Sequence, residues 1–193
     1  MLCTDSIAKV NAERFSKKWV NELTRFREYS DRHWVGETPL QRMSVLDSCH
    51  RILDIGCGVG NALRELKEKG HEVVGFDLTL SNVERTGETL GVEVFAGDMH
   101  DLPFEDESFD GILMWDVLEH ALAPLLVLGE CHRVLRVGGR MLIYLPPETW
   151  QDHPVHVIIP TEKQFRSLVG KVGLNVIGTS KDLNIGTEWH LQK

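Results

Sequence analysis

The amino-acid sequence predicts a single α/β domain in which helices cover both faces of a mostly parallel sheet. From residue 51 onward, short apolar segments alternate with amphipathic ones, which is typical of parallel strands joined by helices. A glycine-rich turn follows the first apolar segment, as in sheets that bind ligands at their strand ends. The length of 193 residues is that of one domain. We therefore expect one sheet with right-handed crossovers.

The first fifty residues precede this alternation and are expected to form a helical cap of the same domain. Apolar side chains recur there at steps of three and four, as on one face of a helix. They are Ala8, Ala12, Phe15, Trp19, Leu23 and Phe26. Gly36 and Pro39 end that helix, and a second short helix is expected at residues 40–47. The predicted boundaries are thus 1–50 for the cap and 51–193 for the α/β domain.

Between residues 51 and 145 the predicted strands and helices alternate. Strands are expected at residues 51–55, 72–77, 92–96, 108–115 and 138–145. Helices are expected at residues 61–69, 80–90 and 124–136. Gly70 closes the first of these helices, and Pro124 opens the last.

The C-terminal part adds one helix and two strands. An irregular segment runs from Pro146 to Pro160, after which Thr161 and Gln164 form the capping box of a helix. The last two strands fit residues 174–181 and 185–191. Because so few residues join them, they can only pair antiparallel at the edge of the sheet.

Composition and charge exclude several classes of protein. The chain has 29 acidic and 21 basic residues and a formal net charge of −8, which argues against a general nucleic-acid binder. No apolar segment is long enough to span a bilayer, and the N-terminus has no signal-peptide core. The four cysteines lack C-x-x-C spacing. We therefore expect a cytoplasmic protein with free thiols and no membrane contact.

The strongest candidate for a ligand site is the turn after the first strand, in ILDIGCGVGN at residues 52–61. Gly56, Gly58 and Gly60 allow a tight turn and close approach of a ligand to the backbone. The next helix begins there, so its N–H groups point toward the ligand. A dinucleotide fingerprint needs a third glycine where Asn61 stands, which makes a nicotinamide-dependent reductase a weak alternative.

Acidic side chains follow the next two strands. Asp77 lies about twenty residues beyond the glycines, where a carboxylate can accept hydrogen bonds from both hydroxyls of a ribose. Asp98 follows the third strand and suits an adenine amino group, with Met99 and Leu102 as apolar surface for the ring. The acidic loop between residues 101 and 107 lacks the spacing of a calcium loop, so we expect it to be solvated.

Five segments occur in a fixed order: ILDIGCGVGN, VVGFDL, GDMHDLPFEDESFD, WDVLEH and LRVGGRMLIYLP. This ordered set resembles class I S-adenosylmethionine-dependent methyltransferases, and most closely their small-molecule branch. The resemblance covers roughly residues 51–147. It implies a Rossmann-like three-layer αβα sandwich, with seven strands in the order 3-2-1-4-5-7-6 and the last antiparallel. It also implies S-adenosyl-L-methionine as cofactor and S-adenosyl-L-homocysteine as product.

The same resemblance implies roles for individual residues. Asp54 would help to hold the amino group of the cofactor, Asp77 would bind the ribose, and Trp115 would contact the methionine end. Asp116 and His120 also match the family in type. The full set of implied cofactor contacts is Asp54, Gly56, Cys57, Gly58, Gly60, Asp77, Leu78, Gly97, Asp98, Met99 and Trp115.

Methyl transfer from a sulfonium needs alignment of the reacting atoms and exclusion of water, and a general base only where the acceptor arrives protonated. His120, His153 and His156 are the candidates for such a base. The spacing of His153 and His156 would also suit a metal, given a third ligand from elsewhere. We assign no metal site from the sequence.

The sequence thus predicts an enzyme, a methyltransferase of a small-molecule acceptor, as a monomer or homodimer, with the O-, N- or C-acceptor atom open. Two alternatives remain. One is a methyltransferase of tRNA or protein that works with a partner, for which a basic face would be needed. The other is a non-catalytic S-adenosylmethionine-binding or scaffold protein.

Overall fold

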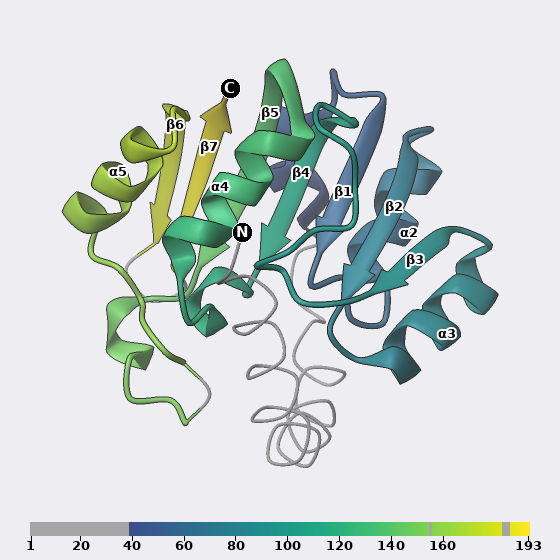
Figure 1. Cartoon of the computed structure of the whole chain (residues 1–193), viewed down its shortest axis with the longest axis horizontal. Helices are drawn as coiled ribbons and strands as arrows, with labels where there is room; N and C mark the ends of the chain where they lie inside the picture. Colours follow the sequence, from purple (N-terminus) through teal and green to yellow (C-terminus); the bar gives the residue numbers. More distant parts are fainter. Residues whose placement is uncertain (1–38, 155, 183–185) are drawn as a thin grey trace.

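The computed structural model describes residues 39–154, 156–182 and 186–193, which form a seven-stranded sheet between two layers of helices (Figure 1). The strand order is β3-β2-β1-β4-β5-β7-β6. The first five strands pair in parallel, whereas β7 runs antiparallel to both β5 and β6. The predicted order and the antiparallel last strand are confirmed. The predicted helix before residue 30 lies outside the described residues.

The strands are β1 (Arg51–Ile55), β2 (Glu72–Asp77), β3 (Glu93–Ala96), β4 (Phe109–Trp115), β5 (Leu135–Leu145), β6 (Asn175–Asp182) and β7 (Gly186–Gln192). The α-helices are α2 (Asn61–Glu68), α3 (Leu80–Leu90), α4 (Pro124–Val134) and α5 (Glu162–Lys171). Three short 3-10 helices are η1 (Pro39–Leu46), η2 (Leu118–His120) and η3 (Glu148–Trp150).

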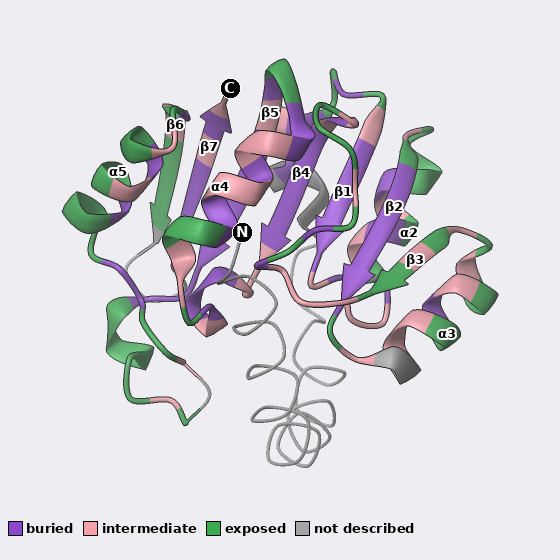
Figure 2. Cartoon of the chain, viewed as in Figure 1, coloured by how far each residue is buried: buried purple, intermediate pink, exposed green. Residues whose placement is uncertain are grey.

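Alternating side chains of the strands fill two separate cores. Ile52 of β1 packs with buried residues of η1 and α2, whereas the next residue, Leu53, packs with buried residues of α4 and α5. In β4, Leu113 lies in the same core as Ile52, and Met114 lies in the same core as Leu53. Because both faces are covered, most residues of the central strands are buried, and the edge strands β3 and β6 carry most of the exposed strand residues (Figure 2).

Two element boundaries differ from the expectation by more than one residue. The helix expected at residues 124–136 ends at Val134, and β5 begins at Leu135 instead of residue 138. Pairing explains the difference, since Leu135 lies opposite Phe109 and the register then shifts before Gly111 pairs with Arg140. The capping box of α5 is confirmed: Thr161 and Gln164 each accept a hydrogen bond from the other's backbone N–H.

The connection from β3 to β4 is held against the sheet by Arg133 of α4. Its guanidinium donates to the backbone oxygens of Leu102 at 2.9 Å and Phe104 at 2.6 Å. It also pairs with Glu130 at 2.7 Å, and Glu130 accepts a hydrogen bond from the N–H of Leu102. One arginine therefore replaces the hydrogen bonds that this irregular backbone cannot make within itself.

In the described part of the chain, no helix has the length and apolarity needed to cross a lipid bilayer.

We predict that Arg133→Met lowers the free energy of unfolding by about 1–3 kcal/mol, because it leaves two backbone oxygens and Glu130 without their donor. Urea unfolding followed by circular dichroism measures this loss. Arg64→Met, on the exposed face of α2, is the control and should change stability by less than about 0.5 kcal/mol. Equal effects of the two substitutions would contradict the role given to Arg133.

Candidate active site

The glycine turn between β1 and α2 lies at the carboxyl end of the parallel strands, and its backbone is tied to β2. The N–H groups of Gly56 and Cys57 donate to the carbonyl oxygen of Phe76, at 2.7 and 3.2 Å. The N–H of Gly58 donates to the Asp77 carboxylate at 2.9 Å. The predicted turn and the predicted acid therefore form one structure, although 19 positions separate them.

Two of the glycines have positive φ but differ in what surrounds them. Gly56 has φ +76°, and a Cβ there would lie 2.3 Å from Cγ2 of Val117. Gly58 has φ +51°, and a Cβ there would meet nothing within 4 Å. The turn is thus packed against Val117 on one side and borders open space at Gly58. Gly60 begins α2 without a side-chain cap, which leaves N–H groups of the first turn available to a ligand.

The Asp77 carboxylate is fixed at the end of β2 by three donors. Besides the N–H of Gly58, it accepts hydrogen bonds from the N–H of Thr79 at 2.8 Å and from the side-chain amide of Asn82 at 3.2 Å. Leu78, the next residue after Asp77, is 47% exposed. A fixed carboxylate beside an exposed apolar side chain suits a ribose with its base.

Asp54 is buried in β1, one strand away from Asp77. Burial, and then the nearby charge of Asp77, raises the pKa of Asp54 to about 7. The charge of Asp77 disfavours ionisation of Asp54 in a site of low polarity. A cationic group bound between them would relieve this repulsion.

The adenine side of the predicted site is organised by a histidine that the sequence analysis overlooked. The Asp98 carboxylate accepts hydrogen bonds from the backbone N–H of His100 and from its ring Nδ1, at 3.0 and 2.5 Å. His100 Nε2 in turn accepts from the N–H of Ala123, just before α4. Asp98 is thereby fixed in place. Leu102 offers no surface to a ring, because it is buried in the core; that expectation was wrong.

At the end of β4, Trp115 stacks on Tyr144 of β5, with ring centroids 4.4 Å apart and planes within 5°. The next residue, Asp116, has φ +52°, a conformation that non-glycine residues rarely adopt. Burial raises the pKa of Asp116 to about 7. Such strained, desolvated groups are found most often at functional sites.

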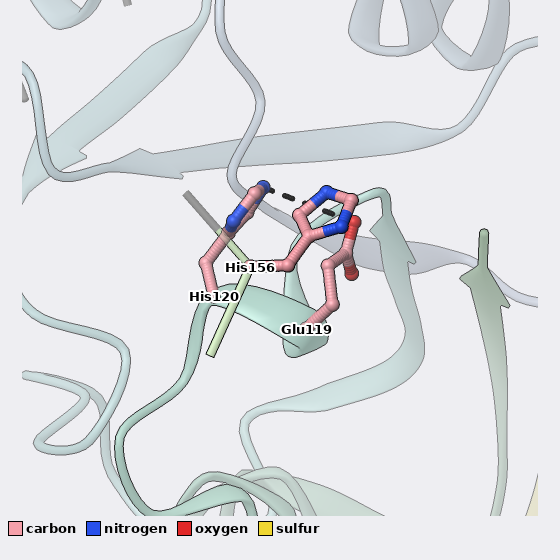
Figure 3. A group of neighbouring side chains, drawn as sticks. All are labelled: Glu119, His120 and His156. Carbon is pink, nitrogen blue, oxygen red and sulfur yellow. Dashed lines mark ion pairs between the residues drawn. The ribbon is translucent and has the colours of Figure 1, made fainter. Parts of the chain in front are cut away.

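The three predicted histidines come together after the end of β4, and Figure 3 shows two of them, His120 and His156. The rings of His120 and His156 have centroids 5.2 Å apart, and those of His153 and His156 4.7 Å. His156 Nδ1 lies 2.7 Å from the backbone oxygen of Trp150 and donates to it. Burial lowers the pKa of His156, which favours its neutral form.

Glu119 completes this group and was not predicted. Its carboxylate is buried, and His120 Nε2 lies 3.8 Å from one of its oxygens (Figure 3). Burial and the neighbouring Asp116 raise the pKa of Glu119 well above its usual range. In the sequence, Glu119 looks like part of a helix cap, since nothing local marks a glutamate as buried.

Comparison with known proteins agrees with this geometry. Residues 53–143 match the family described as a methyltransferase domain. Over residues 53–143 the chain is therefore similar to methyltransferase domains. The residues matched include the glycine turn, Asp77, Asp98 and the end of β4.

Curated relatives are similar to this chain over about half of its length. The demethylmenaquinone methyltransferase of Thermotoga maritima is 38% identical over 104 residues, which are 51% of this chain and 45% of that protein. The 24-methylenesterol C-methyltransferase 2 of Oryza sativa is 36% identical over 119 residues, 56% of this chain and 33% of that protein. This chain thus spans less than half the length of these curated relatives.

Solved structures share the fold over more of the chain. An S-adenosylmethionine-dependent methyltransferase from Mesorhizobium loti superposes with a TM-score of 0.70 at 16% identity, covering 80% of this chain and 95% of that one. The chain solved in complex with the Haloferax volcanii Trm112 methyltransferase activator gives 0.73 at 21% identity, covering 91% and 95%. At these identities, the likeness establishes the fold.

We predict that Asp54 destabilises the ligand-free methyltransferase domain above neutral pH. Its pKa is about 7 in the folded protein and about 4 in an unfolded chain. The folded state therefore binds more protons between these values, and the contribution of Asp54 to stability falls as pH rises from about 4 to about 7. The stability advantage of Asp54→Asn should grow over this range and level off above it, at on the order of a few kcal/mol.

Urea unfolding of both proteins at several pH values measures this difference. Parallel profiles for Asp54→Asn and wild type would show that Asp54 ionises normally.

We also predict that Gly56→Ala destabilises the domain more than Gly58→Ala does. Both substitutions place alanine at positive φ, which costs about 1–2 kcal/mol. Only Gly56→Ala adds a collision with Val117. The second substitution Val117→Ala should therefore recover part of the loss in Gly56→Ala. Chemical denaturation measures the stability of each variant. If Val117→Ala recovered none of the stability lost in Gly56→Ala, the contact between these two positions would not be the cause of the loss.

Proposed function

We propose that this protein transfers a methyl group from S-adenosylmethionine to a small-molecule acceptor. The observation that carries the proposal is the placement of two buried carboxylates, Asp54 and Asp77, on neighbouring strand ends around the glycine turn. A ligand that combines a ribose with cationic groups would satisfy both. S-adenosylmethionine is such a ligand, with an ammonium, a sulfonium and two ribose hydroxyls.

The residues around the turn fit this cofactor. A Cβ at Gly58 would meet open space, so the backbone is accessible there, and Leu78 is exposed beside Asp77. The remaining predicted contacts, among them Cys57, Gly97 and Met99, surround the same strand ends. Cys57 is buried, and burial raises the pKa of its thiol, so we propose contact through its backbone.

When bound, S-adenosylmethionine supplies a methyl group on a sulfur that is already a good leaving group. The chain's own task is alignment and exclusion of water. Asp77 and the glycine turn would orient the cofactor, and the stacked pair of Trp115 and Tyr144 would shield its methionine end. His120, His153 and His156, brought together beside this end of β4, are placed to contact the acceptor or to take its proton.

A small acceptor is supported by the relatives. Their names describe methylation of a sterol and of demethylmenaquinone. By analogy, we propose a metabolite as the acceptor of this chain, methylated at carbon or oxygen. The cytoplasmic location stays a prediction.

A second candidate function is methylation of RNA or protein with a partner. It is favoured by one observation: the structural neighbour of 0.73 TM-score was solved together with an activator protein. Transfer of a labelled methyl group to a metabolite panel, to total RNA and to protein separates these substrates. Transfer to RNA or protein, and none to metabolites, would favour this second function.

We predict that the wild-type protein binds both S-adenosylmethionine and S-adenosylhomocysteine in isothermal titration calorimetry. Asp77→Ala should weaken both at least about tenfold, because it removes a charged hydrogen-bond acceptor and frees the N–H of Gly58. Glu84→Ala, on the exposed part of α3, is the matched control and should leave affinity unchanged.

Absence of binding by the wild type would overturn the proposed cofactor. Binding without transfer to any acceptor class would favour the scaffold alternative.

A further inference from the structure

We propose that Glu119, His120 and His156 form a site for a divalent transition-metal ion of the zinc type. One donor atom from each residue, a carboxylate oxygen or an imidazole nitrogen, lies within 4.8 Å of the other two (Figure 3). Two imidazoles and one carboxylate form a common donor set of zinc sites that keep a fourth position open. Hard ions such as Mg²⁺ prefer oxygen ligands alone, so this donor set disfavours them.

The buried state of Glu119 is the strongest observation for a cation. The residue is buried, and neither carboxylate oxygen has a hydrogen-bond partner of good geometry among the residues that the structure describes. A buried carboxylate without such partners is costly unless a proton or a cation compensates it. His120 Nε2 lies 3.8 Å from one carboxylate oxygen of Glu119, which is longer than a hydrogen bond.

His156 is oriented as metal-binding histidines usually are. Its Nδ1–H donates to the carbonyl oxygen of Trp150 at 2.7 Å. This bond fixes the tautomer and leaves the lone pair on Nε2, the nitrogen available to a ligand. Histidines that bind metals generally donate their other N–H to a carbonyl or carboxylate in this way.

The backbone holds the two segments of the site in register. The N–H groups of Val157 and Ile158 both donate to the carbonyl oxygen of Glu119, at 2.8 and 3.2 Å. The loop that carries His156 is thus tied to the residue that supplies the carboxylate. Zinc bonds of about 2.0–2.2 Å place donor atoms about 3.3–3.6 Å apart, so side-chain rotations that close about 1 Å complete the site.

The site adjoins the glycine turn, because Val117 packs on Gly56 and directly precedes η2. A fourth position on the metal would then be available to an oxygen of the acceptor, a use that rests on the proposed function. The metal site itself does not depend on methyl transfer.

Zinc binding tests the site directly. Protein stripped with a chelator is titrated with Zn²⁺ in competition with a chromophoric chelator. We expect one equivalent bound with a dissociation constant on the order of micromolar or tighter, and at least about tenfold weaker binding in His156→Ala and in Glu119→Gln. His50→Ala, an exposed histidine near β1, is the control and should bind as wild type does.

Co²⁺ gives an independent signature, because a tetrahedral site with nitrogen and oxygen donors produces a distinct visible spectrum. That spectrum should appear with wild type and disappear with His156→Ala. Circular dichroism and S-adenosylhomocysteine binding show that the variants are folded.

Two results would overturn the proposal. One is no Zn²⁺ binding by wild type in the micromolar range, and the other is wild-type affinity in both variants, which would place the ion elsewhere. If the wild type bound Zn²⁺ but not S-adenosylmethionine, the proposed function would fail and the metal site would stand.

Discussion

The close approach of Val117 to Gly56 joins the two halves of the site. Because position 56 has no side chain, the segment after β4 can lie directly against the turn after β1. The strained Asp116 turns the chain at this point and leads it into η2. The cofactor side and the histidine side of the site therefore meet at one contact between backbone and side chain. Any side chain at position 56 would separate them.

The site also concentrates carboxyl groups in a poorly solvated region. Asp54, Asp116 and Glu119 all have raised pKa values, and burial is the largest cause for each. Such an arrangement stabilises nothing in the ligand-free protein, since each ionised group costs free energy there. It favours bound cations instead. The sulfonium and ammonium of the cofactor match the first carboxylate, and a metal ion matches the last.

The sequence predicted those parts of the fold that depend on local pattern. Alternation of apolar segments located the strands, and the residues at the capping box of α5 marked its start, because both signals act between near neighbours. The strand order came from the resemblance and not from periodicity. Local pattern misjudged the start of β5, since the pairing of Leu135 with Phe109 is a contact between distant segments.

In the candidate site too, the residues marked by local pattern were predicted, and those that depend on distant contacts were not. Asp77 and the glycines were found because they follow predicted strands, and the structure joins them by a hydrogen bond. The three histidines were named singly, but nothing in the sequence shows that the N–H groups of Val157 and Ile158 donate to the backbone oxygen of Glu119 and so bring the loop of His156 to this site. His100 and Glu119 were missed because their role follows from burial and from partners elsewhere in the chain.

The loop between β5 and α5 is tied to the sheet more closely than its sequence suggests. Its irregular sequence predicts a surface segment, yet Val157 and Ile158 are hydrogen-bonded to η2, and the N–H of Ile159 donates to the side chain of Gln151. The loop is therefore built onto the end of β4. Its histidines face the strand end where the cofactor's methyl group is proposed to lie. Under the proposed function, substitutions in this loop would change the acceptor and leave the strand ends of the proposed cofactor site unchanged.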